Sequence, residues 1–352
     1  MIGLLGATGY TGRLTAAELA RRGLPHRLGA RNEGRLGRLP RVPGQERTLV
    51  DAGDPAALDR FLDGLTVVIS TAGPFARVGL PVVAAAVRNG VPYVDSTGES
   101  GFIRDVYARF ADAATPVVCA CGFDFIPGDL AVAAAADALG DAAQEVEVVY
   151  EVAGFRPTRG TATSLLESAT HYSLSPSTRT VRFPDREATA IQVSWGEALT
   201  VPRHQPGADV WIGAVVPSYL AGVAPAGVRL FQRAAPLLAR AASHLPEGPS
   251  PAARQRARFR ILATARAGAR SESVLVSGRD AYGLTARLLV EAALSVTGQG
   301  PLTPAQGLGD AAAFLDRVTD ADFSWRRLAS PPATTPRRTV SGTPAKAGVP
   351  TG

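Results

Sequence analysis

The residues with the clearest chemical meaning are three glycines near the start of the chain. Gly6, Gly9 and Gly12 are spaced three apart and follow the apolar residues 1–5, which predict a buried strand. Such glycines allow a tight turn, bring backbone N–H groups against a pyrophosphate and let a helix over 11–22 aim its N-terminus at the phosphates. The residues predicted to contact a dinucleotide here are Gly6, Thr8, Gly9, Tyr10, Thr11 and Gly12.

The end of the second predicted strand, 26–30, indicates which dinucleotide binds. NAD sites usually place an acidic residue roughly 20 residues past the glycines, on the ribose 2′-OH, whereas NADP sites leave that place to Arg. Here Arg31 and Asn32 follow the strand, Arg35 lies one helical turn further on, and no carboxylate stands at the strand end. A guanidinium can bind a 2′-phosphate through two N–H groups, so NADP is the predicted cofactor. A glycine-rich turn in another α/β protein, with solvated arginines nearby, is the alternative.

Two carboxyls are the candidate catalytic groups. Glu99 and Asp124 are flanked by Gly, Thr and Phe residues, so we expect them to be partly buried. Burial raises the pKa of a carboxyl, which would suit a general acid. The structural alternative is that Asp95 and Glu99 cap a helix over 101–113 and that Asp129 interacts with the dipole of the next helix.

The elements that must position these residues alternate along the first 140 residues. We predict strands at 1–6, 26–30, 47–51, 66–71, 91–95 and 116–121, and helices at 11–22, 55–62, 78–89, 101–113 and 128–138. This alternation predicts an α/β fold with a doubly wound, Rossmann-type parallel sheet, in which ligands collect at the carboxyl ends of the strands. The loops at that edge therefore add Asp51, Ala72, Gly73 and Pro74 to the predicted cofactor site.

The two cysteines favour a structural role. Cys119 and Cys121 lie two apart within one predicted strand, so both would point to the same face. Since no Cys or His stands at metal-ligand spacing from them, we expect buried thiols in a reducing compartment and no metal.

The basic residues exclude several mechanisms. All but one of the 37 Lys and Arg residues are Arg, and the single lysine, Lys346, lies near the end of the chain. Schiff-base chemistry, a Walker phosphate loop and a Tyr-x-x-x-Lys pair all need a lysine within the folded body. The net charge of +6 is dispersed and no basic cluster is interleaved with aromatics, so we expect no nucleic-acid partner.

The second part of the chain predicts a different architecture. Residues 145–152 alternate between apolar and polar, and similar runs at 179–183, 189–195, 257–268 and 271–278 predict a second, mixed α/β domain with an antiparallel sheet. Helices are expected at 160–172, where His171 is a further candidate acid or a helix C-terminal partner, and at 282–296. The predicted division is 1–140 for the cofactor domain, 141–280 for a substrate or oligomerisation domain, 281–329 for a helix and segment returning to the first domain, and 330–352 for a disordered tail.

A basic amphipathic segment over 223–242 is a candidate interaction surface. Arg229, Gln232, Arg233 and Arg240 are spaced as on one helix face, and Pro236 interrupts the pattern. The segment is expected to contact either a membrane or acyl-chain surface or the rest of the protein, including a homodimer partner. Without a signal peptide or an apolar stretch of about 18 residues, we expect a cytoplasmic protein, with peripheral membrane contact as the alternative.

The chain resembles the saccharopine dehydrogenase-like oxidoreductases, a broad family that includes the trans-acting enoyl reductases of actinobacterial lipid biosynthesis. The blocks that carry the resemblance are Gly6–Gly12, Gly29–Asn32, Ser70–Phe75, Tyr93–Glu99, Gly122–Asp129, Gly160–Thr161 and Leu302–Ala305. The resemblance implies a Rossmann domain, a mixed α/β second domain, a late helix that returns to the first domain, and NADP or NAD as cofactor. Phe125 and Gly128 depart from the family pattern, which usually has Ser at the first position and often Ser or Ala at the second.

The resemblance does not extend to saccharopine chemistry, because the Lys/His pair of one branch has no lysine to match it in the body of this chain. A nicotinamide cofactor performs hydride transfer, and the protein positions the substrate and supplies or withholds a proton. The predicted function is therefore an NADPH-dependent reductase that acts on a small-molecule or lipid-like, moderately apolar substrate with an enoyl or imine acceptor bond. The alternative is a dinucleotide-binding scaffold without turnover, since a fold alone does not establish activity.

Overall fold

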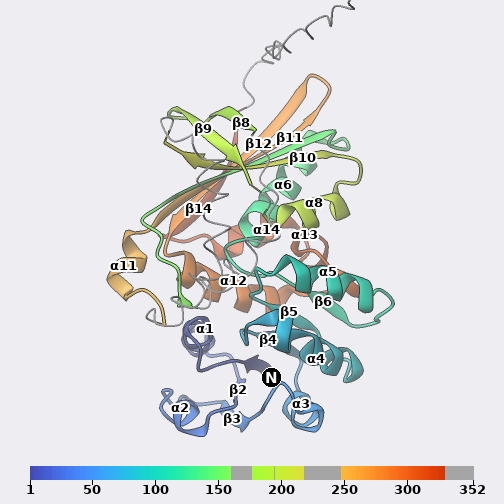
Figure 1. The fold of residues 1–352 in the computed structure, drawn as a ribbon, viewed down its shortest axis with the longest axis vertical. Helices are drawn as coiled ribbons and strands as arrows, with labels where there is room; N and C mark the ends of the chain where they lie inside the picture. The colour runs from blue at the N-terminus through green and yellow to red at the C-terminus, as the bar shows by residue number, and fades with distance from the viewer. Residues whose placement is uncertain (160–176, 194, 218–246, 330–352) are drawn as a thin grey trace, which may run out of the picture.

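Two β-sheets lie at opposite ends of the molecule, and a layer of helices separates them (Figure 1). The computed structural model describes residues 1–159, 177–193, 195–217 and 247–329. Within these residues, each sheet has seven strands. The predicted α/β class is confirmed, with a parallel sheet followed by a second sheet that contains antiparallel strands.

Sheet A is parallel throughout and begins with the chain. Its strands are β1 (Ile2–Leu5), β2 (His26–Ala30), β3 (Gln45–Leu49), β4 (Val67–Ser70), β5 (Tyr93–Asp95), β6 (Pro116–Val118) and β13 (Gly300–Leu302). Their order is β13-β6-β5-β4-β1-β2-β3. The chain therefore adds strands in opposite directions on the two sides of β1. The position between β1 and β4 is the switch point, where dinucleotides bind in doubly wound folds.

Helices cover both faces of sheet A. They are α1 (Tyr10–Arg21), α2 (Glu33–Gly37), α3 (Pro55–Leu62), α4 (Phe75–Arg88) and α5 (Ser100–Arg109), whereas the next helix, α6 (Ile126–Leu139), packs on sheet B. The start of α3 shows why such boundaries could be predicted: Asp54 accepts hydrogen bonds from Ala56 N and Ala57 N, and Pro55 takes the first helical position. Helix α2 was not predicted, because five residues are too few to show a helical period.

The predicted strand 116–121 is three residues too long, and this changes the placement of the cysteines. Strand β6 ends at Val118, and Ala120 adopts a left-handed conformation with φ of 63°. The turn breaks the two-residue alternation of a strand, so Cys119 and Cys121 enter different hydrophobic clusters. The prediction that they share one face is wrong. Both thiols are free and buried, and burial is the main cause that raises their pKa values well above the usual range.

Sheet B corresponds to the predicted antiparallel sheet but is mixed, because one of its strand pairs is parallel. Its strands are β7 (Glu145–Ala153), β8 (Thr178–Arg182), β9 (Glu187–Gln192), β10 (Asp209–Val216), β11 (Arg258–Ala267), β12 (Arg270–Arg279) and β14 (Phe323–Leu328). Their order is β14-β12-β11-β7-β10-β9-β8, and among these described strands only β7 and β10 pair in parallel. Strands β10 and β14 were not predicted.

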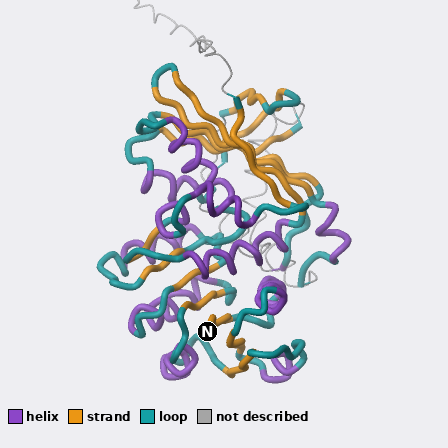
Figure 2. The backbone as a smooth tube through the Cα atoms, turned by 180° about the vertical axis from the view of Figure 1, so that it is seen from behind, coloured by secondary structure: helices purple, strands orange, loops and turns teal. Residues whose placement is uncertain are grey.

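The layer between the sheets joins them into one structure (Figure 2). It contains α6 and the helices α8 (Glu197–His204), α12 (Ala281–Ser295), α13 (Pro304–Gly307) and α14 (Ala311–Val318), while the short α11 (Pro251–Arg256) precedes β11. Helix α6 packs on β11 and β12, and α12 packs against α1, β4 and β5, as the resemblance implies for a late helix. One hydrophobic cluster runs from Leu4 through Leu130 and Leu288 to Ile261. Since β13 joins sheet A and β14 joins sheet B, the segment 281–329 contributes to both sheets.

Several predictions concern residues outside the described part of the chain. They are the helix over 160–172 with His171, the basic segment 223–242 and the disordered tail 330–352. Among the residues that the structure describes, no helix is long and apolar enough to cross a membrane.

Candidate active site

The glycine-rich turn lies at the switch point, between β1 and the loop that follows β4. Gly6 has φ of +83°, and a Cβ there would lie 2.7 Å from Ala72 N, so both the backbone conformation and the close approach require glycine. A Cβ on Gly12 would overlap the carbonyl of Gly6. Gly9, the N-cap of α1, has no side chain that could satisfy the first N–H groups of that helix. These features fit the phosphates of a dinucleotide, because an uncapped helix N-terminus attracts anions.

The loop after β4 is held against this turn. The Thr71 hydroxyl donates to the carbonyls of Leu5 and Gly6, at 3.1 and 3.2 Å. Ala72, Gly73 and Pro74 then lead into α4, whose first N–H groups have a partner of their own: Glu99 Oε1 accepts from Phe75 N at 3.0 Å and Oε2 accepts from Ala76 N at 2.7 Å. Glu99 is thus a buried carboxylate that fixes this loop from a neighbouring strand end.

The structural alternative, in which the Glu99 side chain caps the helix over 101–113, is wrong. Glu99 is the N-cap residue of α5, but its side chain makes no capping bond to that helix. It caps α4 instead, since both oxygens bind the first N–H groups of α4.

The residues predicted to select NADP lie on the other side of the glycine-rich turn. Asn32 caps α2 by accepting from Arg35 N at 2.8 Å, and the Arg35 guanidinium donates to Thr8 O at 3.3 Å. Arg31 is exposed, and no hydrogen bond or ion pair with the described residues engages its side chain. Asp51, at the end of the next strand along, is also exposed and accepts from Gly53 N at 2.8 Å.

Asp124 is an accessible carboxyl in the loop after β6, at this edge of sheet A. Its side chain reaches solvent, yet its two oxygens lie close to the backbone of Gly98 and Gly122, where a Cβ on either glycine would come within 2.7 Å. The surrounding protein displaces water and raises the pKa of Asp124 to about 6, with the charge of Asp95 adding to the effect. A carboxyl that titrates near neutrality and remains accessible can exchange a proton with a substrate.

The other acidic residues of this region are used by the fold. Asp95 is fully buried at the end of β5 and accepts from Thr97 N at 3.0 Å and Ala120 N at 2.8 Å. Asp129 lies in the first turn of α6, as predicted, but its two oxygens bind His204 Nε2 and Ala305 N, each at 2.9 Å. Asp129 therefore ties α6 to the end of α8 and to the start of α13.

A buried pair beside the Asp124 loop was missed at the sequence level. The Tyr150 hydroxyl donates to Glu197 Oε1, and a Cβ on Gly128 would overlap both groups. Likewise, a Cβ on Gly196 would overlap the ring of Phe125. The two departures from the family pattern are thus matched by partners: Gly128 leaves room for the Tyr150–Glu197 pair, and the larger Phe125 fills the space that Gly196 leaves. In the sequence, the departures at Phe125 and Gly128 were the only signal that could have indicated this pair.

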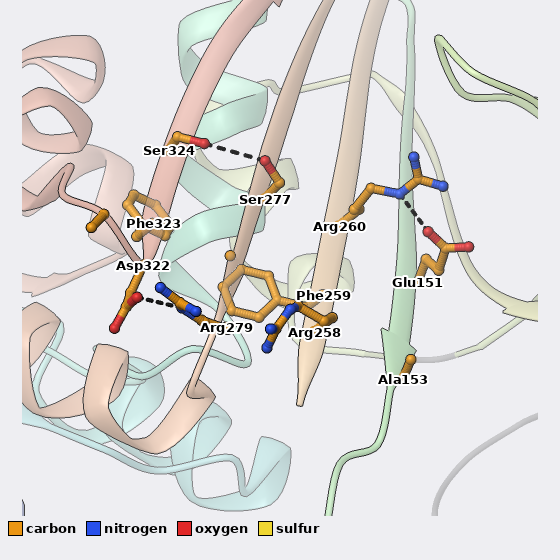
Figure 3. Close-up of a pocket in the computed structure, with 12 residues that line it drawn as sticks. Glu151, Ala153, Arg258, Phe259, Arg260, Ser277, Arg279, Asp322, Phe323 and Ser324 are labelled. Carbon is orange, nitrogen blue, oxygen red and sulfur yellow. Dashed lines mark hydrogen bonds and ion pairs between the residues drawn. The ribbon is translucent and has the colours of Figure 1, made fainter. Parts of the chain in front are cut away.

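A separate groove crosses sheet B, and Figure 3 shows its lining. The side chain of Arg260 binds Glu151 at 2.5 Å, Arg279 pairs with Asp322, and Phe259 and Phe323 contribute rings. Its residues come from sheet B and from the turn before β14, and none belongs to the glycine-rich turn or to the Asp124 loop. We therefore place the candidate active site at sheet A.

Comparison with known proteins identifies a cofactor-binding region and several relatives. A sequence family described as NAD(P)H-binding matches residues 6–115. A putative trans-acting enoyl reductase of Mycobacterium tuberculosis H37Rv is 30% identical over 93% of this chain and 97% of its own length. A trans-acting enoyl reductase of Mycobacterium ulcerans is 30% identical over 88% of this chain and 93% of its own.

A solved structure shows the same fold. Apo saccharopine dehydrogenase (L-Glu forming) from Saccharomyces cerevisiae superimposes with a TM-score of 0.60, at 14% identity, over 93% of this chain and 99% of that one. The resemblance to the saccharopine dehydrogenase-like proteins is confirmed by this fold and by the relatives. The chain is an NAD(P)-dependent oxidoreductase and belongs to the trans-acting enoyl reductase family.

Proposed function

We propose that this protein is an NADPH-dependent reductase that saturates an enoyl bond in a moderately apolar, lipid-like substrate. The observation that carries the proposal is the joint position of three features at one edge of sheet A: the glycine-rich turn, the arginines after β2, and the accessible carboxyl of Asp124. Together they supply a place for a dinucleotide and a group that can deliver a proton.

The preference for NADPH rests on charge at the end of β2. Arg31 and Arg35 are both exposed there, and Arg35 reaches the glycine-rich turn through Thr8 O. The strand end itself presents no carboxylate that would bind a ribose 2′-OH and repel a phosphate. Guanidinium groups bind phosphate oxygens through charge-assisted hydrogen bonds, so this surface favours the 2′-phosphorylated dinucleotide.

The reduction of a conjugated double bond needs a hydride at one carbon and a proton at the other. When bound, the nicotinamide supplies the hydride. Asp124 supplies the proton: its neutral carboxyl gives up H⁺ to the α-carbon of the substrate, directly or through one water molecule, and is left as the carboxylate, which solvent then reprotonates. Glu99 acts as a positioning residue, because its two hydrogen bonds hold the start of α4 and hence the 71–76 loop.

The enoyl acceptor is favoured over an imine by the names of the mycobacterial relatives, which describe enoyl reductases. We further propose a lipid-like substrate, as the resemblance to the enoyl reductases of actinobacterial lipid biosynthesis implies. The basic segment 223–242 remains the candidate for contact with an acyl chain or a membrane surface, and a homodimer and a cytoplasmic location remain predictions.

The test begins with binding and then measures turnover. The purified protein is titrated with NADPH and with NADH while nicotinamide fluorescence is followed, and NADPH oxidation is then measured with a medium-chain trans-2-enoyl thioester. Tight NADPH binding, weak NADH binding and oxidation that depends on the enoyl compound support the proposal, with the saturated thioester as control. Oxidation with a cyclic imine but not with the enoyl thioester would reassign the acceptor. Binding without turnover on either would favour a scaffold.

A further inference from the structure

A short segment from the second part of the chain lies on the glycine-rich turn. Residues 247–250 precede α11, and the Tyr10 hydroxyl donates to the Pro249 carbonyl at 2.5 Å. The Tyr10 ring packs on Gly248, where a Cβ would come within 2.5 Å of the ring. The side chain of Tyr10, at the first position of α1, therefore holds this segment against the predicted phosphate site.

Contact with this segment brings an acidic side chain between two arginines. Glu247 Oε2 lies 2.8 Å from a terminal nitrogen of Arg13, and Glu247 Oε1 forms a short ion pair with Arg35. Both guanidinium groups also donate to Thr8 O, Arg13 at 2.9 Å and Arg35 at 3.3 Å. The two cations thus converge on one anion and on one carbonyl of the glycine-rich turn.

The position of this carboxylate is informative because of what normally binds there. In a doubly wound fold the adenosine ribose lies between the glycine-rich turn and the end of the second strand, and an arginine there accepts the 2′-phosphate of NADP. In this chain Thr8 belongs to the glycine-rich turn and Arg35 follows the second strand, so the ribose is expected between them. A phosphate monoester offers three oxygens and more charge than a carboxylate, so the same two arginines can hold it in place of Glu247.

We propose that the Glu247 carboxylate stands where the 2′-phosphate of NADPH binds, so that NADPH, unlike NADH, must displace it from Arg13 and Arg35. This inference rests on the proposed function. It adds Arg13 to the cofactor site and makes Glu247 a specificity residue that weakens NADPH selectively. The ionised carboxylate and a 2′-phosphate cannot share the two arginines without like-charge repulsion.

The exposure of the three side chains limits how much the Glu247 ion pairs can weaken NADPH binding. The side chains of Arg13, Arg35 and Glu247 are 38%, 46% and 42% exposed, so solvent screens the ion pairs. An exposed pair contributes up to about 1 kcal/mol, which corresponds to about a fivefold change in affinity. Displacement is therefore possible, and its effect is large enough to measure.

The experiment compares NADPH and NADH affinities of the full chain and of Glu247→Gln by fluorescence titration. Gln keeps the size of the side chain and removes its charge, so NADPH should bind about fivefold more tightly and NADH should bind as before. Glu187→Gln is the matched control, since Glu187 is an exposed acid paired with Arg182 on sheet B, and it should change neither affinity. Arg13→Gln should weaken NADPH and leave NADH unchanged.

The outcomes separate this inference from the function on which it rests. Unchanged or weaker NADPH binding by Glu247→Gln would overturn the inference alone, and so would an equal change for both dinucleotides. Wild-type protein that binds neither dinucleotide would overturn the proposed function. Competition provides a second readout: 2′,5′-ADP should gain affinity in Glu247→Gln while 5′-AMP should not, and equal gains would also contradict the inference.

Discussion

The Tyr150 hydroxyl donates to the Glu197 carboxyl in a buried contact directly beneath Gly128. Burial is the main cause that raises the pKa of Glu197 to about 8, and the charges of Asp129 and Asp124 add to it, whereas the bond from Tyr150 opposes it. The other carboxyl oxygen, Oε2, finds no hydrogen-bond partner among the described residues. A neutral Glu197 therefore suits this environment, and the absence of a side chain at position 128 makes room for it.

Substituting Gly128 should destabilise the fold. In Gly128→Ala the added methyl group overlaps Glu197 and Tyr150, and neither buried side chain can move freely. Overpacking of this kind costs about 1–3 kcal/mol, which thermal or urea unfolding would detect. Gly101→Ala is the control, because position 101 lies in α5 with open space around it and should be neutral or stabilising. Equal stabilities for the two variants would contradict the contact.

The Glu197 carboxyl should make stability depend on pH. The folded state holds this proton up to a pH of about 8, whereas the unfolded chain loses it near the ordinary value of 4.5. Between these values the folded state binds more protons, so its contribution to stability is complete below about pH 4.5 and falls as pH rises, by up to about 1.4 kcal/mol per pH unit. In urea unfolding, Glu197→Gln should show a flatter dependence from pH 5 to 8. An unchanged slope would show that folding does not raise the pKa of Glu197.

Asp124 should set the pH dependence of reduction. Since the proposed donor must be protonated and its pKa is raised to about 6, kcat/KM should fall as pH rises above about 6. Asp124→Asn should lose about a hundredfold or more in rate and lose this titration, while NADPH binding is retained. Asp105→Asn, at an exposed site on α5, should keep the wild-type profile. A wild-type profile in Asp124→Asn would assign the proton to another group.

Glu99 should affect both cofactors alike. Glu99→Gln places an amide N–H₂ against one of the two N–H groups at the start of α4, so one buried hydrogen bond is lost. The expected loss is about 1–3 kcal/mol of stability, and NADPH and NADH should weaken together because the 71–76 loop moves. Unfolding and titration on the same sample measure both. A loss of turnover with unchanged stability and binding would instead support the catalytic role first predicted for Glu99.

Arg31 should matter for NADPH alone. Arg31→Ala removes a guanidinium from the exposed end of β2, and a lost charge-assisted bond of about 1.5–3 kcal/mol corresponds to about a ten- to hundredfold loss of NADPH affinity. NADH has no 2′-phosphate and should bind as before. Arg38→Ala, an exposed arginine at the end of α2, is the control. Equal weakening of both dinucleotides would refute the role of Arg31.

The parallel sheet and the glycine-rich turn were predictable because their signals are local. Buried strands such as β1 and β4 are short apolar runs, and the glycines at 6 and 12 meet backbone groups that any chain of this topology would place there. Sequence patterns did not predict the structure where an element was too short to show its periodicity or where a turn interrupted the pattern. Helix α2 has five residues, and the left-handed turn at Ala120 separated Cys119 from Cys121.

The sequence by itself determined the fold class, the place of the dinucleotide turn and the arginines after β2, because spacing and burial along the chain encode them. Only the tertiary structure decided what the acidic side chains do. Glu99 binds N–H groups 23 and 24 residues away, Glu197 binds Tyr150 at a separation of 47, and Glu247 meets Arg35 at a separation of 212. A carboxylate takes its partner and its pKa from groups that packing brings to it, and no pattern of neighbouring residues specifies them.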